Sequence, residues 1–472
     1  MDIAAVKKYI STWVEDNKAE FEACSQFMFD NPELGMQEFD AVEKLTGIAR
    51  EHGFTVETGV AGMPTAFVAS YGAGKPVIAF NVEYDCLPGL SQKVSTCQEA
   101  VREGAPGHGC GHCLIGPAAL TAGIALRHAL EEFGLPGTVR MYGSPGEEIC
   151  IGKPFMARAG LYEDVDAFLD WHPFFNKTFV QRKTNAYFSK YYHFKGKTAH
   201  GNAPWKGRSA LDAAMLMGHA VEMLREHIVP GAEAAANTIN YTFSHVGPEF
   251  PSVVPDRTSV WYVGRFTTTE VMVDALERID NCARGAALAT GVGMESELVT
   301  AVHENIPNLT LGRIVHANYL ELGPMPLTGE QQQFAMDMQK NAGNEPVGIV
   351  QEVFPPCELD APVTDVSEYS WLAPLATIWL GVLPGPSLHH WVITSAAGSD
   401  IGKNAVRHGA KLLARSAIDL VASPRVLEEA WEEFRKARQG RVYECLVPDD
   451  IAPPVNANRE VMEKYRARRA AS

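Results

Sequence analysis

The sequence predicts an α/β fold, a mostly parallel twisted sheet flanked by helices, with a second and smaller unit inserted into it. Two observations predict the large sheet: apolar β-rich runs alternate with helical patterns early in the chain, and the same alternation returns near its end. Over 188–305 the order becomes strand, helix, strand, strand, helix, strand, which is typical of a split βαβ, ferredoxin-like unit. We therefore expect a discontinuous main domain, 1–187 and 306–472, and an inserted domain, 188–305.

The elements follow in order from local signals. Residues 1–21 read as an amphipathic helix that Asp2 can cap. A helix from about 114 to 133 follows a glycine-rich stretch and closes at Gly134. The strands and helices expected elsewhere in the first domain are strands at 65–70, 76–82, 138–142, 167–171 and 376–382, and helices at 328–342 and from 401 onward.

Composition excludes several classes of function. The chain has 472 residues and a formal net charge of −16, which repels phosphate backbones and acidic membrane surfaces, so we expect neither nucleic acid nor membrane as a partner. The longest apolar run, 372–383, is interrupted by Pro374 and is too short to span a bilayer. The first residues do not resemble a signal peptide, and nine cysteines scattered along the chain favour a reducing compartment. We expect a cytoplasmic protein.

Polar side chains follow the expected strands at the places where ligands bind in open α/β sheets. Asp85 follows one strand, Glu147 and Glu148 follow another, and His172 closes a third. The carboxyl ends of parallel strands share one edge of the sheet, so these groups should face a single crevice.

The stretch Gly-His-Gly-Cys-Gly-His-Cys at 107–113 allows two kinds of chemistry. Cys110 and Cys113 form a C-x-x-C pair, which suggests thiol-disulfide exchange. Cys110 and His112 can instead offer a thiolate and an imidazole to one metal ion, with the glycines permitting the tight turn this needs. A glycine-rich turn around a buried thiol is the third interpretation.

The other candidates also have two explanations each. Adjacent carboxylates at 147 and 148 suit a solvated helix start, but in a hydrolase one binds the metal while the other moves a proton. His172 can be a core histidine or a ligand. His389 and His390 lie in a turn from which one of them could reach the same crevice. Asp85 could merely cap a turn. Taken together, one thiolate, several imidazoles and three carboxylates at one sheet edge favour a metal centre.

The motifs resemble those of the metal-dependent amidohydrolases and peptidases related to aminoacylase. Within these, the chain is most similar to the aminobenzoyl-glutamate hydrolases and more distantly to the auxin-conjugate hydrolases. The segments that carry the resemblance are Asn-Pro-Glu-Leu-Gly at 31–35, Gly-Met-Pro-Thr-Ala at 62–66, Glu-Tyr-Asp at 83–85 with Leu-Pro-Gly-Leu-Ser-Gln at 87–92, Gly107 to His112, Ala-Pro-Trp at 203–205 with Gly-Arg-Ser-Ala-Leu-Asp-Ala at 207–213, and Val-Val-Pro-Asp at 253–256.

The resemblance implies a catalytic domain that holds one or two divalent transition-metal ions, zinc, manganese, nickel or cobalt, and a lid domain through which two copies form a homodimer. It implies that Glu147 is the general base and that Asp85 orients a ligand. It further implies that His200 of the lid stabilises an oxyanion, often in the partner's site, and that Glu368 lies near the metals. The metal ligands that it implies are Cys110, His112, Glu148, His172 and His389, with His390 as a rival to His389.

Two departures from the family pattern concern the substrate. Cys113 stands where relatives commonly have Asp or Asn, and Ser252 stands where they commonly have Asn. Arg265, on the next lid strand, can still grip a carboxylate with two hydrogen bonds.

We therefore expect a hydrolase that cleaves the amide C–N bond of a small N-acyl or aminobenzoyl amino acid. A hydrolytic deaminase acting on an activated aromatic amine is the alternative at the same centre. A thiol-disulfide oxidoreductase using Cys110 and Cys113 is the alternative from another class.

Overall fold

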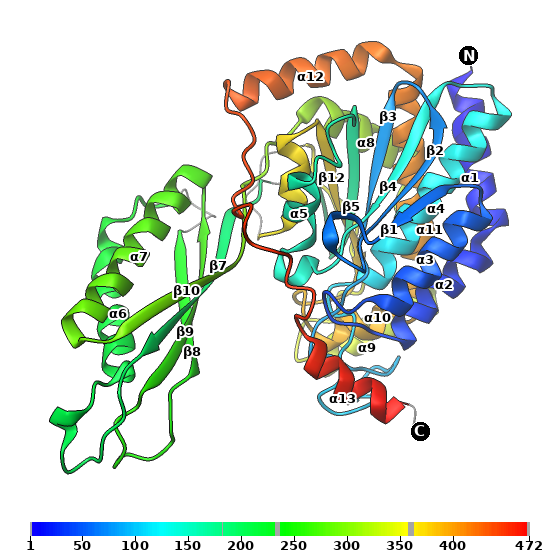
Figure 1. Cartoon of the computed structure of the whole chain (residues 1–472). Helices are drawn as coiled ribbons and strands as arrows, with labels where there is room; N and C mark the ends of the chain where they lie inside the picture. The colour runs from blue at the N-terminus through cyan, green and yellow to red at the C-terminus, as the bar shows by residue number, and fades with distance from the viewer. Residues whose placement is uncertain (1, 182, 232–236, 357–362, 470–472) are drawn as a thin grey trace.

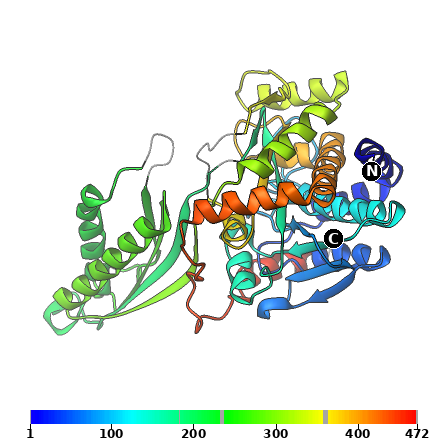
Figure 2. The ribbon, with the colours of Figure 1, turned by 90° about the horizontal axis from the view of Figure 1, so that it is seen from above.

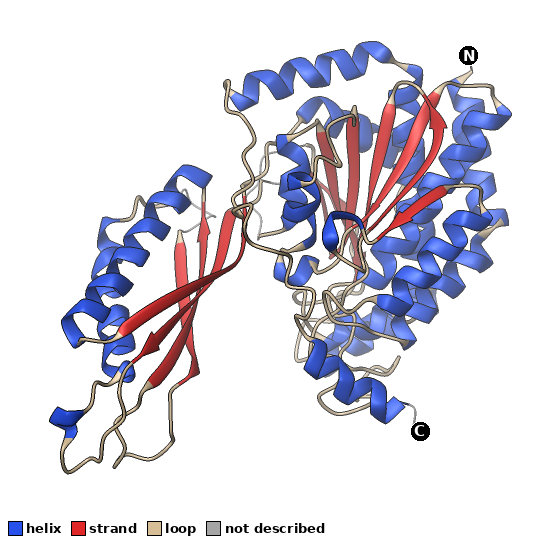
Figure 3. Ribbon diagram, in the orientation of Figure 1, coloured by secondary structure: helices blue, strands red, loops and turns tan. Residues whose placement is uncertain are grey.

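The computed structural model describes residues 2–181, 183–231, 237–356 and 363–469. Two sheets organise these residues, an eight-stranded sheet among helices and a four-stranded sheet beside it (Figure 1). Figure 3 shows most helices gathered around the larger sheet, whereas α6 (Ala210–Leu224) and α7 (Thr269–Thr290) cover the smaller one.

The large sheet has the strand order β1-β2-β4-β3-β5-β12-β6-β11. Its central strands β4, β3, β5 and β12 run parallel to one another, as the alternation of strands and helices predicts. The strand bounds are β1 (Thr55–Thr58), β2 (Phe67–Ala73), β3 (Val77–Val82), β4 (Gly137–Gly143), β5 (Ala167–Phe175), β6 (Lys177–Val180), β11 (Glu352–Val353) and β12 (Leu375–Leu383).

Both edges differ from a simple parallel arrangement: β6 runs antiparallel to β12 at one edge, and two antiparallel pairings form the other. β2 runs antiparallel to β4, and β1 runs antiparallel to β2. The apolar content of each strand is a local property of the sequence, but its direction is not, because direction depends on which neighbour the strand joins.

Alternating side chains of the central strands supply two separate cores. In β3, Ile78, Phe80 and Val82 belong to the larger hydrophobic cluster, whereas Val77 and Ala79 belong to a second cluster on the opposite face. Because successive side chains of a strand point to opposite faces, the unbroken apolar run means that both faces are covered.

Helices cover both faces of the large sheet. α4 lies against the sheet and beside α11, and α1, α2 and α3 pack on this pair (Figure 2). Asp2 caps α1 by accepting hydrogen bonds from the N–H groups of Ala4 and Ala5, which confirms the predicted start. The helix bounds are α1 (Ile3–Asp16), α2 (Lys18–Asp30), α3 (Phe39–Glu51), α4 (His112–Glu132), α5 (Gly152–Arg158), α8 (Leu309–Leu322), α9 (Gly329–Asn341), α10 (Trp391–Ala397), α11 (Asp400–Ala422), α12 (Pro424–Arg438) and α13 (Arg459–Arg469).

The small sheet confirms the expected split βαβ arrangement. Its strand order is β10-β7-β9-β8 and every pairing is antiparallel, the order that two interleaved βαβ units produce. The boundaries of the inserted domain at 188 and 305 stay a prediction. The element bounds are β7 (Ala186–Lys195), α6 (Ala210–Leu224), β8 (Thr238–His245), β9 (Arg257–Phe266), α7 (Thr269–Thr290) and β10 (Gly293–Val302).

α4 is the central helix of the larger unit. Among the described residues it is the one helix long and apolar enough to cross a membrane. Within its most apolar 18-residue stretch, 89% is buried inside the protein. It approaches β3 so closely that a Cβ atom on Gly116 would lie 2.5 Å from the backbone oxygen of Glu83. This contact sets the distance between the first turn of α4 and the end of β3.

We predict that Gly116→Ala lowers the free energy of unfolding by about 1–3 kcal/mol, because backbone must move to admit the methyl group. Gly47→Ala in α3 is the matched control, since a Cβ there meets no atom within 4 Å. That substitution should raise stability by about 0.5–1 kcal/mol, the usual gain of replacing Gly by Ala in a helix. Urea titration of both variants measures the difference, and equal stabilities would contradict the close approach.

Candidate metal centre

The expected ligands come from the ends of strands and the start of α4, and they meet at one edge of the large sheet. Cys110 and His112 flank Gly111, whose φ of 87° lies in the left-handed region that glycine adopts without strain. Glu148 lies in a short 3₁₀ turn (Glu147–Ile149) after β4, and His389 follows β12. His172 lies within β5, which continues to Phe175, and not at the strand end as we expected.

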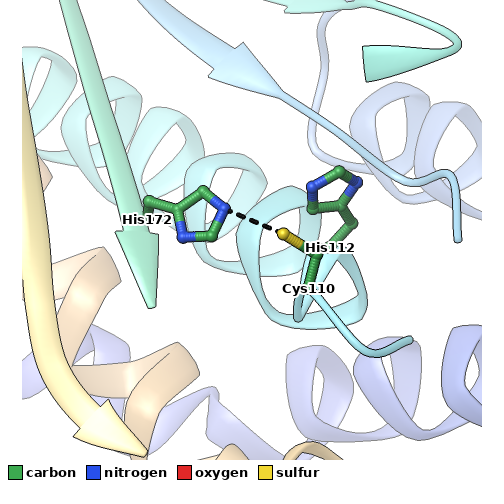
Figure 4. Close-up of side chains that lie close together, drawn as sticks. All are labelled: Cys110, His112 and His172. Atoms are coloured by element: carbon green, nitrogen blue, oxygen red, sulfur yellow. Dashed lines mark hydrogen bonds between the residues drawn. The ribbon is translucent and has the colours of Figure 1, made fainter. Parts of the chain in front are cut away.

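Two groups of three potential metal ligands share the thiol of Cys110. One consists of Cys110, His112 and His172, and the other of Cys110, Glu148 and His389, with the ligand atoms in each group within 4.8 Å of one another. Figure 4 shows Cys110 between the two imidazoles of the first group, with its Sγ 3.4 Å from Nε2 of His172. In the second group, Nε2 of His389 lies 3.3 Å from a carboxylate oxygen of Glu148.

Asp85 holds two members of the site in place. Its Oδ1 lies 2.9 Å from Nδ1 of His112, and its Oδ2 accepts a hydrogen bond of 3.0 Å from the backbone N–H of Glu148. Burial alone would lower the pKa of His112, but the carboxylates around it, Asp85 foremost, raise that pKa well above its usual value. The contact with Asp85 leaves Nε2 as the ring nitrogen that faces the site.

Two buried atoms at the centre have no hydrogen-bond partner among the residues that the structure describes. They are Nε2 of His112 and Oε1 of Glu148, which lie 3.8 Å apart. A buried polar atom without a partner is costly, so a cation between these atoms would satisfy both. Thiolate, imidazole and carboxylate groups are the ligands that divalent transition metals take in proteins, so these residues fit such an ion.

The imidazole of His172 is held in the form that binds metals. Its Nδ1 lies 2.7 Å from the backbone oxygen of Pro173, which directs Nε2 toward Cys110. Burial, assisted by nearby His112, lowers the pKa of His172 to about 4, so the ring is neutral at pH 7. Its ring also stacks on Trp379 with a centroid distance of 4.5 Å.

Glu147 lies beside the two ligand groups that share Cys110, and with Glu83 and His112 it forms a third group of possible ligands. Its Oε2 is 3.6 Å from Nε2 of His112, and burial, followed by the charge of Glu83, raises its pKa well above the usual value. A carboxylate whose pKa is raised in this way is suited to take up a proton near neutral pH.

A cavity of about 270 Å³ opens over the centre. Arg265, near the end of β9, lines it together with Tyr187, near the start of β7, so this end of the small sheet reaches the cavity. The other lining residues are Cys110, Glu147, Glu148, Cys150, His172, Val363, Thr364, Trp379, Leu388 and His389.

Two lid residues expected at the site lie elsewhere within the chain. His200 pairs with Val253, and the backbone N–H of Gly201 donates to the oxygen of Ser252 at 2.7 Å. Both loops lie at the end of the small sheet that points away from the large one (Figure 1). Neither His200 nor Ser252 lines the cavity of its own chain.

Cys113 does not reach the cavity. It is fully buried in α4, within the larger hydrophobic cluster. Burial raises the pKa values of both Cys110 and Cys113, whereas disulfide exchange needs a thiol with a lowered pKa. The placement of Cys113 therefore contradicts its expected contact with the substrate and disfavours the oxidoreductase alternative.

The geometry also separates His389 from His390. Nδ1 of His390 accepts a hydrogen bond of 3.3 Å from the N–H of Val392 and so caps α10. Of these two histidines, only His389 belongs to a ligand group among the described residues.

Glu368 lies outside the ligand groups, at the connection between the two sheets. Its Oε1 lies 2.8 Å from Nδ1 of His303, and its Oε2 accepts a hydrogen bond of 2.6 Å from Tyr443. Both carboxylate oxygens are thus occupied away from the centre, contrary to the position that we expected.

Sequence reasoning missed Glu83, Lys153 and Asp365. Glu83 is two residues before Asp85, and this spacing along an extended segment was a signal that both side chains face the site. Although burial favours the neutral acid, Lys153 lowers the pKa of Glu83 to about 2. Lys153 also pairs with Asp365, which lies 212 positions away in the sequence, so no local pattern could indicate that contact.

Comparison with known proteins agrees with this geometry. Residues 79–306 match Peptidase family M20/M25/M40. One of the polypeptides of the p-aminobenzoyl-glutamate hydrolase of Escherichia coli is 33% identical over 95% of this chain and 98% of that protein.

Solved structures share the fold. A putative aminohydrolase from methicillin-resistant Staphylococcus aureus gives a TM-score of 0.63 at 18% identity, covering 88% of this chain and all of that one. Bacillus subtilis YXEP, described as a dinuclear metal-binding peptidase, gives a TM-score of 0.54 at 17% identity, covering 84% of this chain and 97% of that one. The full-length relative, the matched segment and the shared fold lead to one conclusion: the chain belongs to Peptidase family M20/M25/M40, a family of metal-dependent hydrolases.

Proposed function

We propose that this protein hydrolyses the amide C–N bond of a small N-acyl or aminobenzoyl amino acid. The observation that carries the proposal is the pair of ligand groups that share Cys110, with the carboxylate of Glu147 beside them. The relationship to the Escherichia coli hydrolase over nearly the whole chain supports the amide bond as the target.

One or two divalent ions, zinc, manganese, nickel or cobalt, would be held by the two groups that share Cys110. Bound there, such ions supply Lewis acidity toward a carbonyl oxygen and lower the pKa of water. Asp85 fixes the ligand imidazole of His112 and the backbone of Glu148, so the ligands are preorganised and little rearrangement is needed on binding.

Glu147 moves the proton in this mechanism. Its carboxylate takes a proton from the attacking water and gives it to the nitrogen of the leaving amine, so the carboxylate is regenerated in each turnover. The neighbouring peptide of Glu148 is anchored on Asp85, which keeps the two carboxyl groups of this turn in separate roles.

Arg265 is suited to bind the carboxylate of the amino-acid part. Its guanidinium lies 5.7 Å from the ring of Tyr187, which also lines the cavity, and its one other side-chain contact in the described residues is a 3.4 Å hydrogen bond to Asn240. A guanidinium that is not held by a buried partner can form two parallel hydrogen bonds with a carboxylate.

The segment 188–305 would act as a lid and as the surface through which two cytoplasmic copies form a homodimer. The position of the loop that carries His200, at the far end of the small sheet, supports this assembly because His200 is not among the residues that line the cavity over the centre of its own chain. In a dimer, His200 of one copy would stabilise the oxyanion in the site of the other. Closure of the lid would exclude water from the reaction.

We predict that Glu147→Gln abolishes turnover, lowering kcat by about 100- to 10,000-fold, while the protein keeps its metal. Turnover is measured with N-acyl amino acids and aminobenzoyl amino acids after reconstitution with each metal, and metal content by elemental analysis. The control is Glu131→Gln, an exposed carboxylate at the end of α4. Activity retained in Glu147→Gln would refute this mechanism, and ammonia released without a carboxylic acid would identify a deaminase.

We predict that Arg265→Ala raises KM by about 10- to 100-fold, because the substrate carboxylate loses a charged partner. Arg257→Ala is the matched control, since it lies on the same strand at the end away from the cavity. Equal KM values for the two variants would exclude Arg265 from substrate binding. A substrate amide that lacks the carboxylate should respond to neither change.

We predict that His200 acts in the partner's site, which mixing of two inactive variants can test. In a dimer of one Glu147→Gln chain and one His200→Ala chain, one of the two sites keeps both intact residues. After the two chains exchange partners, the mixture should regain about one quarter of wild-type activity. No recovery, although mixed dimers form, would place His200 in the site of its own chain and refute the prediction, and an active His200→Ala protein would place His200 outside the reaction.

A further inference from the structure

The ammonium of Lys153 lies fully buried beneath the metal centre, and nothing in the proposed reaction uses it. The side chain is 0% exposed, as is that of its partner Asp365, while Glu83 is 2% exposed. Lysine is almost never fully buried unless it is paired, since removing the charge from water costs several kcal/mol. Buried ion pairs contribute little net stability, so this group calls for a specific role.

Lys153 fixes one oxygen of Glu83. That oxygen, Oε1, accepts two hydrogen bonds of 2.8 Å, from Nζ of Lys153 and from Nδ2 of Asn81. The other oxygen, Oε2, lies 3.8 Å from Nε2 of His112. Two donors on a single oxygen hold the carboxylate in one orientation, so its second oxygen faces the ligand nitrogen of His112.

Lys153 also connects this carboxylate to the 3₁₀ segment η5 (Asp365–Trp371). Its Nζ donates to Oδ1 of Asp365, and its backbone N–H donates to Oδ2 of the same residue at 3.3 Å. A second link comes from Tyr369 of η5, whose hydroxyl donates to Asn81 at 3.1 Å. The η5 segment is therefore fastened to Glu83 at two points.

The same segment holds the chain where it leaves the small sheet. Ser370 accepts a hydrogen bond of 2.8 Å from the N–H of Ile306, and the indole of Trp371 donates to the oxygen of Glu304 at 2.6 Å. One side of η5 thus contacts the network beneath the metal centre, and its other side contacts the connection to the lid.

We propose that Lys153 is a positioning residue of the metal centre, which holds Glu83 against His112 and fastens η5 beneath the same site. It touches neither the cavity nor the five expected ligands, so it acts through Glu83. The charge of Glu83 is thereby kept within reach of the metal ligands in a fixed direction.

The test is the double substitution Lys153→Met with Asp365→Asn, which removes one positive and one negative charge and keeps side-chain volume. The matched control is Lys190→Met with Asp280→Asn, an ion pair of the same kind with a distance of 2.8 Å in the small unit. Both proteins are titrated with cobalt(II), and their visible spectra are recorded. Their kcat and KM values are measured with the best substrate.

We expect the Lys153 variant to bind cobalt about 10- to 100-fold more weakly than wild type, with an altered spectrum, because Glu83 loses its orientation. Its kcat should fall, and its KM should stay within about twofold, since the substrate contacts are unchanged. The Lys190 variant should match wild type in all of these measurements, although its thermal stability falls.

A folded Lys153 variant with the wild-type cobalt titration and spectrum would overturn the proposal. An unchanged kcat would overturn it as well. The kinetic part rests on the proposed hydrolysis, but the cobalt titration does not. An enzyme that hydrolyses no amide would refute the proposed function and leave the cobalt result to decide on Lys153.

Tyr369→Phe keeps the test decisive if the double variant does not fold. This change removes the hydroxyl that donates to Asn81 and that also lies 3.1 Å from the hydroxyl of Ser144, and it leaves the ring stacked on Phe168 with a centroid distance of 4.2 Å. We expect cobalt binding about 3- to 10-fold weaker than wild type. Wild-type binding and spectrum in this variant would then overturn the proposal.

Discussion

The structure depends on positively charged partners that balance the negative charge of the carboxylates buried at the carboxyl edge of the large sheet. Glu83, Asp85 and Glu147 all lie around the single imidazole of His112, and none of them is more than 9% exposed. Charges in such a place are stable only with partners of opposite sign. Lys153 and the hydrogen bond from His112 supply part of this balance, and a divalent cation at the unpartnered atoms would supply the rest. Binding of such a cation would therefore be coupled to the folding of this edge.

The fold meets this demand by bringing segments distant in sequence to one place. Parallel strands end at the same edge, so β3 and β4 place Asp85 and the turn at Glu147 side by side. The close approach of α4 to β3 then brings His112, at the start of the helix, within hydrogen-bonding distance of Asp85. Because the ligands are carried by sheet edge and helix terminus, their separation is set by backbone packing, which resists deformation.

The sequence was sufficient where the determinants are local. The helix expected over 114–133 is α4, and the alternation in β9 yields a strand with one buried face. The order of elements in the small unit follows in the same way. Cys110 and His112 lie two residues apart, so their proximity was also a local property. The sequence was not sufficient to predict a contact that joins distant segments or that depends on tertiary packing. Neither the burial of Cys113 nor the pairing of Lys153 with Asp365 has a pattern within one segment.

In the proposed function, the division of the site between two units separates the chemistry from substrate recognition. The groups that can hold a metal and move a proton all belong to the large unit, whereas Arg265 reaches the cavity from the small one. A change in the angle between the units would move Arg265 relative to Glu147. The hinge is held by His303 and Glu304, whose partners Glu368 and Trp371 belong to η5, the segment that also contacts the carboxylates beneath the centre. Because η5 contacts both regions, the orientation of the small unit and the geometry of the buried charges are linked through this segment.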